Sequence, residues 1–153
     1  MGVATGVAFS GAALCAQPPP PAPAAQAQMV PAARTFGSDA GLVLNFIKPD
    51  KIKDFETLIG KLKEVLANSD KPLRREQARS WKVFKSSEPA AGGAAVYVFF
   101  SDPIVKSADY AVTTILSEAL PADEASALVR QYSDCFATGQ NWLNLALVSD
   151  LGK

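Results

Sequence analysis

The sequence contains no histidine, and its only cysteines are Cys15 and Cys135. Without histidine the chain lacks the usual general base near neutral pH, the commonest metal ligand and every Ser-His or Cys-His arrangement. Two cysteines are too few for a disulfide framework, and no carboxylate cluster has the spacing of a metal site. We therefore expect neither a metal nor another cofactor.

The chain also lacks an excess of either charge, because fifteen basic residues balance fifteen acidic ones. A nucleic-acid-binding protein normally carries a basic excess, so this balance argues against that class. One basic concentration is present, and two interpretations of it stay open: it steers an anionic ligand or a polyanion, or it is a solvated loop without a partner. Its residues are Lys71, Arg74, Arg75, Arg79, Lys82 and Lys85.

The first part of the chain, residues 1–39, differs in composition from the rest. Residues 3–16 form a small-apolar run without a charge, and Ala25-Gln26-Ala27 fits a signal-peptidase site. The basic residues that normally precede a secretory run are absent, and the run is too short to form a stable membrane span. Prolines among Ala and Gln then predict a disordered spacer. We expect a periplasmic or secreted protein; the alternative is an unstructured terminus without a targeting role.

The remaining residues, 40–151, predict one folded domain. Four apolar segments, at residues 42–47, 81–84, 96–100 and 142–148, alternate with two helical stretches. This order, β-α-β-β-α-β, is that of a ferredoxin-like α+β sandwich, in which helices cover one face of a four-stranded antiparallel sheet.

Local signals set the ends of the helical stretches. The first has an apolar stripe from Ile52 to Leu66 and stops before Pro72, so the basic residues that follow are expected in a loop. Asp102 and Pro103 have the pattern of a helix N-cap followed by proline, which predicts the start of the second stretch. Pro121 is expected to break that stretch in two.

The strands carry apolar residues on both faces, although the helices can cover only one. Val43 and Ile47 alternate with Leu42, Leu44 and Phe46, and Tyr97 and Phe99 alternate with Val96, Val98 and Phe100. We expect the uncovered face, carrying residues such as Val43 or Phe99, to be buried against a second copy of the chain. The sequence thus predicts a homodimer.

With this element order and these doubly apolar strands, residues 40–151 resemble the dimeric α+β barrel superfamily, which includes antibiotic-biosynthesis monooxygenase-like proteins. The stretches at residues 81–85, 101–103 and 139–141 are also similar to those of bacterial proteins of this class. The resemblance implies that two sheets close face to face. It also implies a small ligand between the helices and the concave face of the sheet.

Candidate ligand-binding residues follow from this expectation. Asn45 and Asn144 are polar residues inside apolar strands that the fold would place side by side, where they would bind a ligand or satisfy one another. Aromatic residues would line the pocket or simply pack in the core. The aromatic candidates are Trp81, Tyr97, Tyr110 and Tyr132.

Three functions stay open on the sequence alone. The first is an exported, homodimeric domain that binds a small apolar molecule, and the second is a cofactor-independent monooxygenase or isomerase-like enzyme. The third is a non-catalytic structural or interaction module. No sequence feature assigns a catalytic residue.

Overall fold

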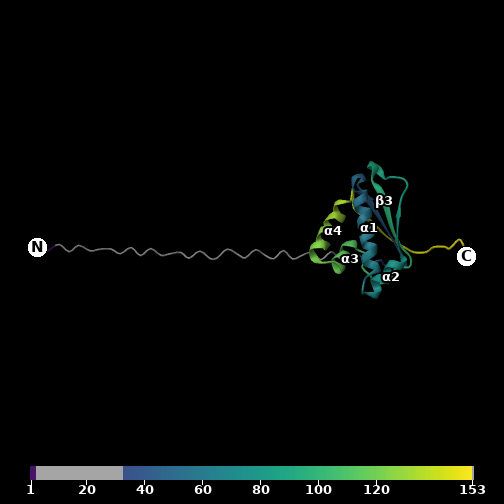
Figure 1. The fold of residues 1–153 in the computed structure, drawn as a ribbon, viewed down its shortest axis with the longest axis horizontal. Coiled ribbons are helices and arrows are strands. Elements are labelled where there is room, and N and C mark those ends of the chain that lie inside the picture. The colour runs from purple at the N-terminus through teal and green to yellow at the C-terminus, as the bar shows by residue number, and fades with distance from the viewer. Residues whose placement is uncertain (3–32, 153) are drawn as a thin grey trace. The chain divides into compact units, whose positions relative to one another are not determined.

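The computed structural model describes residues 1–2 and 33–152. The signal-like run, the cleavage site, Cys15 and the proline-rich spacer lie outside the described residues. From residue 33 onward the chain forms four strands and four α-helices, together with two short 3-10 turns (Figure 1). In chain order these are β1 (Ala40–Ile47), a turn at Pro49–Lys51, α1 (Ile52–Ala67), α2 (Pro72–Ser80), β2 (Trp81–Lys85), a turn at Ala91–Gly93, β3 (Ala95–Ser101), α3 (Val112–Ala119), α4 (Ala122–Asp134) and β4 (Asn141–Leu145).

The strands form one antiparallel sheet in the order β2-β3-β1-β4. This order and the helices between the strands make an α+β fold of the ferredoxin-like type, as the sequence predicts. The expected break in the second helical stretch is also confirmed, because α3 ends at Ala119 and α4 begins at Ala122, on either side of Pro121.

The helices cover one face of the sheet, and the core lies between the two layers. Along β1, Val43, Asn45 and Ile47 are buried while the residues between them are half-buried. Phe55 of α1 is fully buried and contacts the aromatic rings of Tyr97, Phe99, Tyr132 and Phe136, at centroid distances of 4.8–6.2 Å. These rings tie the central strand β3 to α1, to α4 and to Phe136 just after α4.

The structure corrects the predicted assignment of the sheet faces. Val43 and Phe99 are each 2% exposed and belong to the helix-covered face, not to the open one. The other set of alternating residues makes up the open face, and it is also apolar. By strand register this face carries Leu42, Leu44, Phe46, Phe84, Val96, Val98, Phe100, Leu143 and Leu145.

The expected loop between the first helical stretch and the second strand is partly helical. Residues 72–80 form α2, with Pro72 in its first turn and good helix formers behind it. Its buried face includes Arg74 and Gln77, which pack against the rest of the domain. The stretch was missed as a helix because its buried residues are polar and leave no apolar stripe.

Two further boundaries differ from the prediction. The second helical stretch begins at Val112 and not at Asp102, because the preceding connection bonds to the N-terminal segment: Ile104 N–H donates to Asp39 O at 2.7 Å and Tyr110 N–H to Arg34 O at 2.8 Å. The last strand ends at Leu145 and not at residue 148, because Leu145 pairs with Ala40, the first residue of β1. Beyond it β1 offers no partner.

Candidate ligand-binding site

Asn45 is fully buried, and protein groups bond both ends of its side-chain amide. Its Nδ2 donates to the carbonyl oxygens of Val43 and Tyr97, both at 3.2 Å. Its Oδ1 accepts a hydrogen bond from Nε2 of Gln140 at 2.6 Å. Because a buried amide is stable only with partners, Gln140 does for Asn45 what a ligand would otherwise do.

Tyr132 belongs to the same network. Gln140 Nε2 also donates to its hydroxyl at 2.8 Å. Burial raises the pKa of Tyr132 far above its ordinary value, and the hydrogen bond from Gln140 offsets this only in part. Tyr132 is therefore a neutral phenol that helps to hold β1, α4 and the start of β4 together.

Asn144 does not meet Asn45. The register pairs Asn144 with Gly41, four residues from Asn45 along β1, so the expected adjacency is wrong. Asn144 is exposed, and its Oδ1 accepts a hydrogen bond from Gly37 N–H at 2.8 Å. Its role in the structure is to fasten the turn before β1 to β4.

Tyr97 and Tyr110 are buried in the core. The Tyr97 hydroxyl donates to Glu56 Oε1 at 2.5 Å, and both burial and this carboxylate raise the pKa of Tyr97. The Tyr110 hydroxyl accepts from Val105 N–H at 3.0 Å, while its ring packs edge-on against Trp81 at 5.3 Å. Of the predicted aromatic residues, Trp81 and Tyr110 thus pack against one another, whereas Tyr97 and Tyr132 pack against Phe55. Trp81 is only half-buried.

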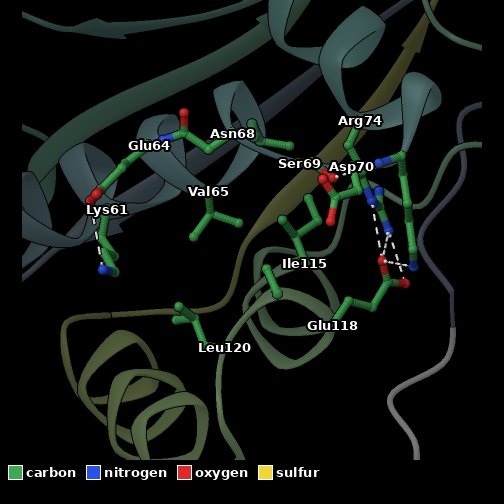
Figure 2. A pocket seen from close by; sticks show the side chains of 13 residues that line it. Lys61, Glu64, Val65, Asn68, Ser69, Asp70, Arg74, Ile115, Glu118 and Leu120 are labelled. Carbon is green, nitrogen blue, oxygen red and sulfur yellow. Dashed lines mark hydrogen bonds and ion pairs between the residues drawn. The ribbon is translucent and has the colours of Figure 1, made fainter.

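One cavity in the described part of the chain lies where the C-terminal half of α1 meets the α1–α2 connection and α3. It has a volume of about 340 Å³. Figure 2 shows Arg74 and Glu118 facing one another on one side of it and Lys61 beside Glu64 on the other. We call it the polar cavity; its lining is Lys61, Glu64, Val65, Leu66, Asn68, Ser69, Asp70, Lys71, Arg74, Ile115, Glu118, Ala119 and Leu120.

Arg74 is the most completely bonded side chain of the polar cavity. Its Nη2 donates to both carboxylate oxygens of Glu118, at 3.0 and 3.1 Å, and its Nη1 to Gln77 Oε1 at 2.9 Å and to Asp109 O at 2.5 Å. Lys71 Nζ reaches the same carboxylate at 2.8 Å. With its donors occupied, Arg74 acts as an anchor between α2, α3 and the connection before α3, and leaves little for a ligand.

Glu118 should stabilise the fold only while it is ionised. Burial raises the pKa of its carboxyl, but hydrogen bonds and charge from Lys71 and Arg74 outweigh burial and hold that pKa below its usual value. Such a group adds stability above its unfolded-state pKa, and the stability is lost as the pH falls through the folded-state pKa. We therefore expect the stability gap between the unmodified protein and Glu118→Gln to close below about pH 4. Thermal unfolding of both proteins across this range measures the gap; a gap independent of pH would contradict the assignment.

A second cavity lies between α1, α2 and the start of β2, and it has a volume of about 540 Å³. Most of its lining is aliphatic or aromatic, and Trp81 is the one predicted site residue in it. We call it the apolar cavity; its lining is Ile59, Leu62, Lys63, Leu66, Ala67, Arg75, Ala78, Arg79, Trp81 and Val83.

Two helices supply most of this lining through one-turn spacing. On α1, Ile59, Leu62 and Leu66 recur three and four residues apart, and on α2 Arg75 is followed by Ala78 and Arg79. The sequence does signal the helix that carries Arg75, Ala78 and Arg79, because Pro72 is a favourable first helical residue and good helix formers follow it. The prediction placed these basic residues in a loop and so missed that they line a cavity together.

The basic concentration of the sequence is divided among several places in the structure. Lys71 and Arg74 bond to Glu118, and Lys85 bonds to Glu56 at 2.8 Å. Arg75 and Arg79 line the apolar cavity. Lys82, which pairs with Phe100, lies on the open face of the sheet.

Residues 1–2 and 33–152 contain neither a metal-ligand cluster nor a membrane-spanning helix. In that part of the chain no three His, Cys, Asp or Glu side chains are grouped so as to hold a metal ion. None of the helices described there has the length and apolar character needed to cross a bilayer.

Similarity to known proteins is low. No protein-family model and no curated protein matches the sequence. Among solved structures the chain is similar to Rv0793 from Mycobacterium tuberculosis, with 14% sequence identity and a TM-score of 0.39, over 73% of this chain and 96% of that chain.

Proposed function

We propose that this domain is a homodimeric binding module whose apolar cavity holds a small, largely apolar molecule. The observation that carries the proposal is the cavity itself, at about 540 Å³ and lined mainly by aliphatic side chains and Trp81. Small-molecule sites typically enclose about 300–1,000 Å³ and have a mostly apolar lining with a few polar groups. This cavity lies between α1, α2 and β2, and neither Asn45 nor Tyr132 lines it.

The chemistry of the lining favours binding over catalysis. General acid–base and nucleophilic catalysis use a carboxylate, thiol, hydroxyl, imidazole or amine at the reacting atoms. Among the ten lining residues only Lys63 carries such a group; the other polar members are Arg75, Arg79 and the Trp81 indole. A single amine without an acid or a second base beside it supports binding better than the enzyme alternative.

The homodimer is proposed from the open face of the sheet. The face joins three side chains of β1 to those of its neighbours in one apolar surface, and Phe84 is 53% and Leu143 45% exposed on it. Soluble monomers rarely expose a contiguous apolar patch of several hundred Å². A second copy would cover it face to face, in the arrangement of the dimeric α+β barrel superfamily, to which we propose the chain belongs.

The segment after β4 adds to the surface that a second copy would cover. Leu147, Val148 and Leu151 are 82%, 97% and 97% exposed. An isolated exposed apolar residue is ordinary, but three within the five residues 147–151, which follow the edge strand β4, favour an interface. Export stays a prediction that rests on residues 3–27 alone.

Filling the apolar cavity should weaken binding there. Ala78 is half-buried in the cavity wall, and we expect Ala78→Phe to weaken binding of Nile red, a neutral apolar dye, by roughly tenfold or more. Dye fluorescence at increasing protein concentration measures the affinity. The matched control is Ala127→Phe, on the exposed face of α4, with circular dichroism confirming that both variants are folded. No dye binding by the unmodified protein, or equal binding by Ala78→Phe, would contradict the proposal.

A further inference from the structure

We infer that the ligand of the apolar cavity is a free anionic amphiphile, a single-chain carboxylate whose tail packs on the aliphatic lining and whose head meets the basic residues. This inference rests on the proposed function and adds the chemical class of the ligand. It starts from the charge balance of the lining, which has three basic residues and no acidic one: Lys63, Arg75 and Arg79.

The excess of positive charge is local to this cavity. The whole chain is neutral, with fifteen basic and fifteen acidic residues. In the polar cavity, which shares Leu66 with the apolar one, acidic partners neutralise the basic side chains: Lys61 pairs with Glu64 at 3.6 Å and Arg74 with Glu118 at 3.0 Å. The basic side chains of the polar cavity thus have acidic partners within that cavity, whereas the lining of the apolar cavity has no acidic residue. Its positive charge is available to an anionic ligand.

The bonding of the three basic side chains agrees with this role. Among residues 33–152, Lys63 and Arg79 form no hydrogen bond or ion pair through their side chains, and Arg75 uses Nη1 to bond the Ser69 carbonyl at 2.6 Å. A guanidinium has five N–H donors in a fork that matches a carboxylate. Two arginines one turn apart on α2, with Lys63 across from them on α1, therefore suit one carboxylate head group.

The arrangement favours a free molecule over a membrane surface. A helix that lies on a bilayer exposes a broad apolar face beside its basic residues. On α2 only Leu73 is a large exposed apolar residue, whereas the apolar side chains near Arg75 and Arg79 line a concave space. Such a space takes up a single tail.

Calorimetric titration of the full chain with decanoate, hexanoate and 1-decanol tests the inference. We expect decanoate to bind roughly tenfold more tightly than 1-decanol, with the gain falling as salt is added, because exposed charges are screened. Affinity should rise up to about fourfold per buried methylene from hexanoate to decanoate. Lys63→Gln/Arg79→Gln should remove most of the advantage of decanoate over 1-decanol, because both basic side chains line the cavity.

The controls separate this inference from the proposed function. Lys53→Gln/Arg130→Gln makes the same change in net charge at exposed sites outside the cavity and should bind decanoate as the unmodified protein does. Equal affinity for decanoate and 1-decanol, or no effect of the cavity variant, would overturn the anionic class while apolar binding stands. Binding to phosphatidylglycerol vesicles but not to decanoate would also overturn it, in favour of a membrane surface. No binding of decanoate, 1-decanol or Nile red would remove both proposals.

Discussion

Lysine in place of Leu44 should convert the proposed dimer to folded monomers, whereas lysine in place of the neighbouring Val43 should unfold the domain. Leu44 lies on the open face of the sheet, paired with Val98, and Val43 is 2% exposed beneath the helices. In a two-fold dimer the new charge occurs on both copies of the same patch, so one substitution acts twice. At Val43 the same charge has no water and no partner, and burying it costs several kcal/mol or more.

Light scattering coupled to size-exclusion chromatography gives the mass, and circular dichroism gives the fold. Thr57→Lys, at an exposed position of α1, should leave both unchanged. A stable monomer of the unmodified protein at micromolar concentration would remove the dimer proposal. A Leu44→Lys protein that stays dimeric would place the interface on another surface.

This pair of substitutions also shows where sequence reasoning about the sheet ends. The alternation along residues 42–47 was enough to divide the side chains into two sets, because strand side chains point to opposite faces in turn. Both sets are apolar, however, and periodicity does not tell which one the helices cover. The buried set turned out to contain Asn45, whose amide finds partners in Tyr97 and Gln140. The more buried face of β1 is therefore the one that carries a polar residue, so hydrophobicity alone would not have identified the face that the helices cover.

The order of the strands and of the helices other than α2 was predictable, since each apolar segment and helix stripe is local in the sequence. The element boundaries that failed depend on distant contacts. Val112 starts α3 because Asp39 and Arg34 occupy the donors of the preceding connection, and β4 stops where β1 begins. Nothing within either segment carries that information.

The candidate site was predicted in part. Trp81 and the basic concentration were both named from the sequence, and both contribute to the apolar cavity. Trp81 and these basic residues line one cavity with Ile59 and Leu62 because α2 packs against α1. No local sequence pattern reveals that packing. Asn144 was misplaced for a similar reason, because the register of β1 and β4 sets its neighbours.

Replacing Arg74 should cost far more stability than replacing Arg75, its neighbour in the basic concentration. We expect Arg74→Met to lower the free energy of unfolding by about 3 kcal/mol, the lower end of the range for breaking a buried ion pair. Arg74 is 5% exposed, and its loss leaves Gln77 Oε1 without this donor and Glu118 with Lys71 alone. Met fills a similar volume, so the cost is one of hydrogen bonds and charge, with little from a cavity. Lysine at position 74 should not rescue the loss, because an ammonium cannot reproduce the bidentate fork.

Arg75→Met is the matched control, with the same chemical change one residue away. Arg75 is exposed and gives up one hydrogen bond to the Ser69 carbonyl, so we expect a change within about 0.5 kcal/mol. Urea denaturation at one fixed protein concentration compares the two variants, since dimerisation would make stability depend on concentration. If both variants lose the same small amount, the basic residues form a solvated surface after all, and the bonding of Arg74 is not what holds α2 to α3. If only Arg74→Met greatly lowers the free energy of unfolding, the two neighbouring arginines have different roles. Arg74 then stabilises the fold, and Arg75 is available to bind a ligand.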